Sequence, residues 1–186
     1  MKVIKDILSI KRIMIVLFIL IFIFLSIYRY NSINNSYPTP IHQQYKMKEH
    51  VNYSNCEISV NDYYFMEQSD INLLFESEQK NYQKVECIVL NVNIQNNSDS
   101  FQQVDITSLI LKSDIWKNAI HFAGFMELNE DASMIVELDS KQTKTLLLPF
   151  SINSVQFSSL KTWSHCKTMQ YELVLSLYPI KNTIKL

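Results

Sequence analysis

The chain has 186 residues, of which 47% are hydrophobic and 19% are charged, and its formal net charge at pH 7 is −1. This length predicts one domain with accessory segments. The part from Arg29 onward carries thirteen bases against seventeen acids and has no strongly basic stretch. Nucleic acid is therefore excluded as an expected partner.

The N-terminal segment predicts one transmembrane helix. Residues 13–28 are a run of 16 without a charge, and four bases against one acid precede it. As a helix this run spans about 24 Å, slightly less than the roughly 30 Å hydrocarbon core, and flanking basic side chains can close the gap. The positive charge predicts a cytoplasmic N-terminus and an extracytoplasmic C-terminal region. The expected anchor residues are Ile13, Phe18, Phe22, Phe24 and Tyr28.

A cleaved signal peptide is the alternative to a retained anchor. Signal peptidase requires small residues just after the apolar core, and here only Ser26 is small. We therefore expect a retained signal-anchor. The predicted organisation is a basic cytoplasmic tail over 1–12, a membrane segment over 13–28, an extracytoplasmic stalk over 29–50 and the main domain over 51–186. Twenty residues of flexible stalk would span about 25 Å.

The stretch Val85–Ser98 predicts the central strand of the domain. Its apolar residues recur at every second position and so share one face, while the alternate side chains become more polar along the strand. The apolar positions are Ile88, Leu90, Val92 and Ile94. The segment Asn96–Asp99 ends the strand, because such side chains hydrogen-bond their own backbone.

Shorter strands are expected on both sides of this one. Residues 63–84 have two interpretations: a short helix capped by Ser69-Asp70 and running through Phe75, or an irregular connection with a strand at 63–66. The turn Asp139–Lys141 predicts a hairpin, and Pro149 indicates that its second strand lies at an edge or ends there. The other expected strands are 56–60, 102–111, 115–122, 125–128, 134–138, 143–151, 171–179 and, at the last edge, 181–186.

Seven to nine short strands with frequent turn signals predict an all-β fold, and a β-sandwich is favoured. A small barrel would show the same periodicity and is the alternative. The turns use Asn, Asp and Ser, since Gly124 is the single glycine of the chain.

Three stretches in this order, Asn91–Ser98, Glu137–Phe150 and Tyr171–Pro179, resemble a group of exported Gram-positive proteins. Those proteins carry uncharacterised immunoglobulin-like domains, similar in fold to a mycobacterial immunoprotective extracellular antigen family. The resemblance covers residues 55–186 and implies an immunoglobulin-like antiparallel β-sandwich at the cell surface. It transfers no site residues.

The sequence shows no catalytic or metal-binding motif. The histidines lack metal-ligand spacing. Ser164-His165-Cys166 sets nucleophiles beside a base, but neighbours on an extended chain point to opposite sides, so a loop role is favoured. A calcium site at Asn129–Asp131 would lack the alternating oxygen ligands of known loops. We expect no enzymatic activity and no cofactor. The histidines are His42, His50, His121 and His165.

Three cysteines in an oxidising compartment allow one disulfide. Cys56 begins the first predicted strand and Cys166 precedes the last long one. Because the first and last strands of such sandwiches are often neighbours, Cys56–Cys166 is the expected pairing. Cys87 is expected on the wetter face of the central strand, outside this bond. Three reduced thiols are the alternative.

Three functions are compatible with these features. The leading hypothesis is a non-enzymatic protein-binding or structural module of the cell envelope, anchored in the membrane and contacting another envelope or membrane protein. The second is an accessory subunit of a secretion, transport or sensory complex, in which Phe18, Phe22 and Phe24 pack against other helices. The third is an envelope hydrolase whose site is assembled from distant loops. The oligomeric state stays open.

Overall fold

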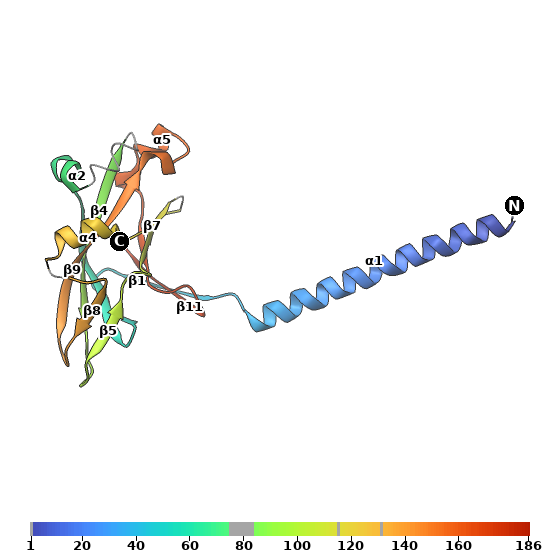
Figure 1. Cartoon of the computed structure of the whole chain (residues 1–186), viewed down its shortest axis with the longest axis horizontal. Coiled ribbons are helices and arrows are strands. Elements are labelled where there is room, and N and C mark those ends of the chain that lie inside the picture. Colours follow the sequence, from blue (N-terminus) through green and yellow to red (C-terminus); the bar gives the residue numbers. More distant parts are fainter. Residues whose placement is uncertain (1, 75–83, 115, 131) are drawn as a thin grey trace. The chain divides into compact units, whose positions relative to one another are not determined.

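The structure is a computed structural model of the chain, and it describes residues 2–74, 84–114, 116–130 and 132–186, with side chains from Met14 onward. The chain divides into two compact units, residues 1–40 and residues 41–186, and each is described by itself. The first unit is a single helix and the second is a mostly β domain (Figure 1).

Helix α1 (Lys2–Ser36) is longer than the predicted membrane segment. Within it, Met14–Ser36 is long and apolar enough to cross a membrane, as a single-pass anchor or a signal sequence would be. Its 23 residues span about 35 Å, so the expected shortfall disappears. Residues 29–36, predicted as stalk, continue the helix because they contain no proline or glycine. The helix ends before Tyr37, since a residue that precedes proline disfavours helical backbone.

Eleven strands lie in the described part of the second unit. A five-stranded sheet has the order β1 (Ile41–Lys46), β11 (Ile180–Lys185), β10 (Glu172–Val174), β6 (Ile110–Lys112) and β7 (Lys117–Ala119). A four-stranded sheet has the order β2 (Val51–Tyr53), β3 (Cys56–Phe65), β4 (Val85–Gln95) and β9 (Thr143–Asn153). Strands β5 (Gln102–Asp105) and β8 (Ile135–Leu138) form a separate pair. Every pair is antiparallel except β1 with β11.

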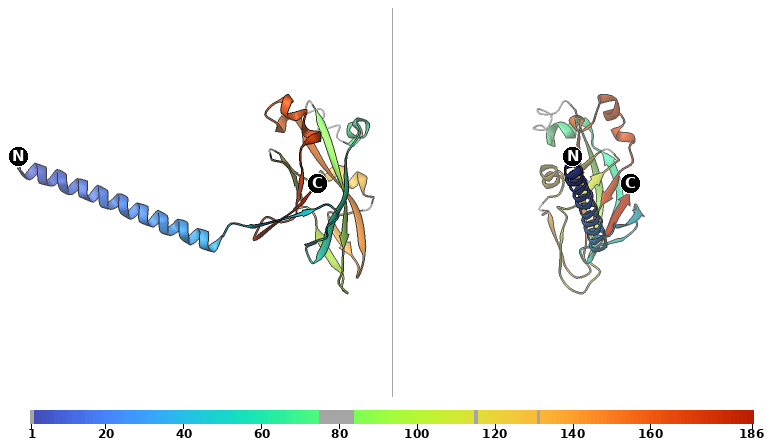
Figure 2. Two further views of the ribbon diagram at one scale, coloured as in Figure 1. Left: turned by 180° about the vertical axis from the view of Figure 1, so that it is seen from behind. Right: turned by 90° about the vertical axis from the view of Figure 1, so that its right-hand side faces the viewer.

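The two larger sheets form the layers of a β-sandwich, as the sequence predicts. Their inward side chains make one apolar core, and the four alternating apolar residues of β4 are all fully buried in it. The long strands β4 and β9 run most of the length of the domain, with α2 (Gln68–Leu74) and α5 (Leu160–Trp163) at one end and β5 and β8 at the other (Figures 1 and 2). Other inward residues are Ile58, Val60, Leu111, Leu148, Phe150, Leu173 and Ile184.

The first half of the outer face of β4 is also buried, which corrects one expectation. Cys87 has the predicted parity, opposite Ile88, but its side chain is fully buried and not wet. Cys87, Val85 and Val89 form a second cluster with Ile71 of α2. Leu128 of α4 (Phe122–Leu128) packs against this cluster. The predicted short helix is thus present, although Phe75 lies outside the described residues.

Strand β9 is an edge strand, as Pro149 predicts, but the predicted hairpin is not formed. Strand β8 pairs with β5, whereas β9 pairs with β4 along its whole length. The free edge of β9 is covered, because the Asn129 side chain bonds both the N–H and the C=O of Leu147, at 2.8 Å each. The His121 N–H also donates to the Pro149 carbonyl at 2.8 Å. Such bonds protect an edge from pairing with another chain.

Residues 125–128, predicted as a strand, lie in helix α4. His121 is its N-cap, and its Nδ1 accepts a hydrogen bond from the Gly124 N–H at 3.0 Å. This cap satisfies a backbone donor at the start of the helix. The prediction of a strand at 125–128 did not take this cap into account. Of the neighbouring predicted strand 115–122, only β7 is present, and Ile115 lies outside the described residues.

Two further predicted strands have different limits. The predicted end of the first strand at Asn61-Asp62 is a register shift within β3, which runs on to Phe65. The predicted strand 102–111 divides into β5 and β6, which belong to different sheets. It divides because the Asp105 carboxylate accepts from the N–H and the Oγ1 of Thr107, at 2.8 and 2.6 Å, and so forms a turn. Such divisions, with β1, raise the strand count above nine.

The predicted stalk contains strand β1, which pairs in parallel with β11 from Ile41–Ile180 to Lys46–Lys185. The last strand is therefore covered by β1 and is not the edge that the sequence predicts. The connection between α1 and the domain shortens to the four residues 37–40. Five peptide steps from Ser36 to Ile41 span at most about 18 Å.

The difference in burial between the two faces of β4 at Leu90 and Asn93 predicts opposite outcomes for two aspartate substitutions. Leu90→Asp places an unpaired charge in the core and should destabilise the domain by more than about 4 kcal/mol, enough to prevent folding. Asn93→Asp should be tolerated, since the half-buried Asn93 accepts from Thr145 Oγ1 through Oδ1, and a carboxylate accepts equally well. Chemical unfolding of the full chain in detergent, followed by circular dichroism, measures both. Equal losses would contradict the assignment of the two faces.

Candidate functional site

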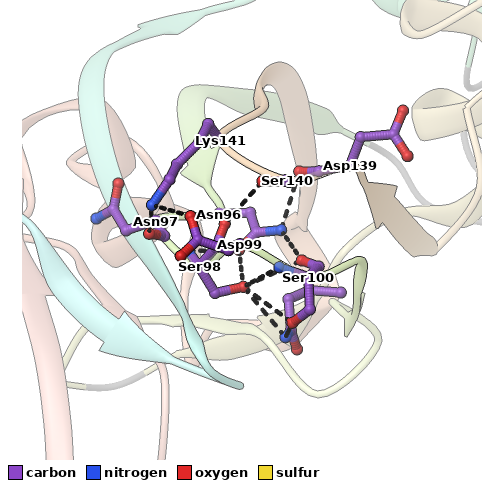
Figure 3. A network of polar contacts seen from close by, with 9 residues as sticks. Asn96, Asn97, Ser98, Asp99, Ser100, Asp139, Ser140 and Lys141 are labelled. Carbon is purple, nitrogen blue, oxygen red and sulfur yellow. Dashed lines mark hydrogen bonds and ion pairs between the residues drawn. The ribbon is translucent and has the colours of Figure 1, made fainter.

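A polar network joins the loop after β4 to the turn between β8 and β9 (Figure 3). The loop is Asn96–Ser100 and the turn is Asp139–Lys141. Both follow strands at the end of the domain where β5 and β8 lie. The sequence analysis identified both segments, the first as the end of a strand and the second as a turn.

Asn96 is the centre of the network and is fully buried. Its Nδ2 donates to the carbonyl oxygens of Ser100, Asp139 and Leu138, at 2.7, 2.9 and 3.3 Å. Its Oδ1 accepts from the N–H and the Oγ of Ser98, at 2.9 and 2.7 Å. An amide nitrogen has two hydrogens, so two of the three carbonyl oxygens share one hydrogen. Asn96 thus spends its whole bonding capacity within the chain.

Lys141 closes the network from the other side. Its backbone φ is 60°, the left-handed region that glycine usually occupies. The Lys141 Nζ donates to the Asn97 carbonyl at 2.7 Å and pairs with the Asp99 carboxylate at 2.8 Å. Asp99 is almost fully exposed, so this ion pair adds little stability. The arrangement fixes two loops and leaves no converging polar groups for a ligand.

The four histidines are dispersed. His121 caps α4, and the His42 Nε2 lies 3.0 Å from the Thr183 Oγ1 within the five-stranded sheet. His50 Nδ1 lies 3.4 Å from the Glu57 carboxylate. His42 and His50, which the sequence analysis assigned to the stalk, therefore belong to the domain. Among the described residues, no group of three His, Cys, Asp or Glu side chains is placed to hold a metal ion.

In Ser164-His165-Cys166, the Ser164 Oγ lies 3.4 Å from the His165 Nδ1, but both groups are also held by one backbone carbonyl. The segment is a helical turn between α5 and the 3-10 helix η2 (Cys166–Thr168), not extended chain. Ser164 Oγ donates to the Lys161 carbonyl, and His165 Nδ1 lies 2.8 Å from the same oxygen. The Cys166 thiol is buried. At Asn129–Asp131, the Asn129 amide is engaged by β9, and Asp131 lies outside the described residues.

All three cysteines lie within the described residues, and no disulfide joins them. The expected Cys56–Cys166 pairing assumed that their strands are neighbours. Instead β3 pairs with β2 and β4, whereas β10, which follows Cys166, pairs with β11 and β6 in the other sheet. Burial raises the pKa of both thiols, and the Glu86 charge raises that of Cys166 further.

Cavities open on the described part of the domain. One, of about 330 Å³, is lined by Lys112, Ser113, Asp114, Met169, Gln170 and Glu172. Its Lys112 and Glu172 face each other at 3.1 Å, and Gln44 of β1 donates to the same carboxylate at 2.9 Å. The second cavity, of about 390 Å³, lies along β8 and β9 and includes Glu137 and Lys144. In the first, the charges of Lys112 and Glu172 are matched, so the pair serves to join β6, β10 and β1.

The sequence analysis missed an exposed apolar surface, here named the apolar tip. It lies at the β10–β11 turn and the start of β1, and its large side chains are all exposed. The detectable signal was the run of six residues, 175–180, without a charged or amide side chain directly after β10. The apolar tip consists of Ile41, Leu177, Tyr178, Pro179 and Ile180.

Residues 40–182 match a family model described as "Domain of unknown function (DUF5028)". The chain belongs to the DUF5028 family. The match begins one residue before β1, so β1 is part of the DUF5028 domain and not of a linker. No curated protein matches the chain.

Several solved structures are distantly similar to this DUF5028 chain. The yjhA protein from Bacillus subtilis is 15% identical over 76% of this chain and 98% of its own, with a TM-score of 0.44. An uncharacterized β-sandwich protein from Clostridium difficile 630 is 12% identical over 78% and 95%, with a TM-score of 0.43. A conserved hypothetical protein from Bacillus anthracis is 17% identical over 76% and 95%, with a TM-score of 0.44. The β-sandwich is shown by the two packed sheets of this chain, while the immunoglobulin-like assignment stays a prediction.

The saturated amide of Asn96 predicts a stability effect that its neighbour lacks. Asn96→Ala leaves buried carbonyl oxygens without donors and should cost about 2–4 kcal/mol of unfolding free energy. Asn97→Ala is the matched control, because Asn97 is exposed and contributes its backbone carbonyl to the network. Its effect should stay within about 0.5 kcal/mol. A larger loss in the control, or none in Asn96→Ala, would show that the network is not structural.

The burial of the thiols predicts slow modification in the folded protein. The thiolate is the reactive form, so a raised pKa and burial both protect Cys56 and Cys166. Alkylation under non-reducing conditions should label few thiols at pH 7 and all three after unfolding, as mass spectrometry would count. A crosslinked Cys56–Cys166 peptide from envelope-purified protein would restore the disulfide that the sequence predicts.

Proposed function

We propose that this DUF5028 protein is a membrane-anchored module of the cell envelope. Its β-sandwich stands on the outer face of the membrane and serves as a non-enzymatic protein-binding or structural domain. The observation that carries the proposal is a helix with an exposed, apolar 23-residue span, joined by four residues to a folded β domain. A signal cleaved after Tyr28 would leave residues 29–40 ahead of β1, whereas a retained anchor would hold the domain close to the membrane through the short connection.

The polar groups of the domain support the non-enzymatic part of the proposal. Asn96, His121 and Asn129 each bond to backbone groups of their own domain and hold loops or an edge strand in place. Side chains engaged in this way are positioned for structure, since catalysis requires polar groups that converge on a substrate. The immunoglobulin-like resemblance suggests the same kind of surface role.

An accessory subunit of a secretion, transport or sensory complex is the second candidate. Its supporting observation is that Phe18, Phe22 and Phe24 of α1 are all largely exposed within this chain. Replacing these three with leucine keeps the helix apolar and inserted. Loss of co-purifying membrane proteins in that variant, but not in the parent chain, would favour this candidate.

The orientation of the anchor gives a direct test of the proposal. Protease added to intact, wall-stripped cells should digest the domain and leave a membrane-bound remnant of residues 1 to about 40, because the N-terminal charge keeps that end inside. Immunoblotting with tags at each end measures the outcome. Full-length protected protein would contradict the orientation, and a mature chain that begins after Tyr28 would identify a cleaved signal.

A further inference from the structure

The apolar tip is exposed yet firmly held. The exposed fractions of its side chains are 65% for Ile41, 60% for Leu177, 49% for Tyr178 and 37% for Ile180. Single exposed apolar residues are ordinary on protein surfaces, whereas a contiguous group commonly marks an interaction site. The group is contiguous because Ile41 and Ile180 are register partners in the parallel pair of β1 and β11.

Hydrogen bonds fix the conformation of this turn. The Ser176 Oγ donates to the Ile180 carbonyl at 2.7 Å and accepts from the Asn182 N–H at 3.2 Å, which joins the two ends of the turn. The Ile41 N–H donates to the Pro179 carbonyl at 3.3 Å and ties the start of β1 to it. A surface that is ordered before binding loses little conformational entropy when it binds.

The chain connection limits how far this tip can be from a membrane that holds α1. Residue Ile41 of the tip follows Ser36, the last residue of α1, by five peptide steps, at most about 18 Å. The polar last turns of α1, residues 29–36, add about 12 Å of helix beyond the apolar run. The limit is set by covalent geometry and holds for any orientation of the domain.

The charges near the tip suit an anionic lipid surface. The part of the chain from Arg29 onward has an excess of acids, yet residues 29–48 and 173–186 contain no Asp or Glu. Lys181 directly follows Ile180 of the tip, whereas Lys46 and Lys185 are register partners at the opposite end of the β1–β11 pair. Basic side chains near the surface are attracted to anionic headgroups, and tyrosine is typical of the membrane interface.

We infer that the apolar tip inserts into the headgroup interface of the membrane that holds α1 and docks the β-sandwich on the bilayer surface. This inference rests on the proposed anchoring by α1. The occupant of the tip is lipid, and the domain lies against the bilayer instead of moving freely on a tether.

The test compares two leucines in the full chain reconstituted into vesicles of phosphatidylcholine and phosphatidylglycerol. Leu177→Cys and, as matched control, Leu73→Cys are each labelled with an environment-sensitive fluorophore. Leu73 is 80% exposed and lies on α2, which covers the outer face of the other sheet. The three native thiols are buried, so the parent chain measures background labelling. Unfolding curves of both variants check that the fold is retained, as expected for exposed positions.

We expect the probe at 177 to shift its emission to the blue and to be quenched by lipids that carry a spin label near the headgroup, because these report shallow insertion. The probe at 73 should show neither change. Adding Ile180→Asp and Tyr178→Asp to the 177 variant should abolish the quenching while the chain still sediments with the vesicles.

The failures are distinguishable. Chains that sediment with the vesicles but show equal, unquenched probes would overturn the docking and leave the anchor intact. Chains that stay in the supernatant would overturn the proposed anchoring, and the docking with it. A shielded probe at 177 in native membranes, without quenching in pure lipid vesicles, would assign the tip to a protein partner and overturn the lipid inference.

Discussion

The fold depends on strand β4, which is paired along both edges and is buried on its inner face and on the first half of its outer face. Its neighbours β3 and β9 satisfy its backbone groups, so the strand can lie inside the protein without unpaired N–H or C=O groups. One face supplies the four apolar residues of the sandwich core, and the other supplies Cys87 and Val89 to the cluster under α2. Helices α2 and α4 are thereby fixed on the outside of the four-stranded sheet, and α4 in turn protects the edge of β9.

The parallel pair of β1 and β11 has the largest consequence for function. It brings residues that follow the apolar helix directly into the five-stranded sheet, and so replaces a flexible stalk with a link of four residues. A twenty-residue coil would leave a domain free to reach distant partners. A four-residue link holds it near the end of the helix, where a partner or surface must lie close to the membrane. The same pair creates the apolar tip, since Ile41 and Ile180 become neighbours only through it.

The polar side chains of the domain divide into two kinds. The first kind bonds to backbone groups and fixes the positions of loops and of an edge strand, as Asn96, Asn129 and His121 do. The Lys112–Glu172 and Lys167–Glu86 ion pairs, at 3.1 and 2.9 Å, join elements far apart in the chain. The exposed apolar side chains of the tip are a further surface feature, and their position beside the link underlies the docking that we infer.

The sequence by itself determined the parts that depend on local pattern. Alternation of apolar residues identified β4, Pro149 indicated the edge character of β9, and an uncharged run identified the membrane-spanning candidate within α1. Tertiary structure decided what depends on distant partners. Residues 41–46 are polar and have no apolar alternation, so only β11 makes them a strand. Residues 125–128 became helical because His121 caps them and α4 packs beside β9. Strands β8 and β9 flank a good turn, but each found its partner in a different sheet. Cys56 and Cys166 stayed apart for the same reason, because strand order is set by the packing of the whole chain and is not encoded in any local stretch.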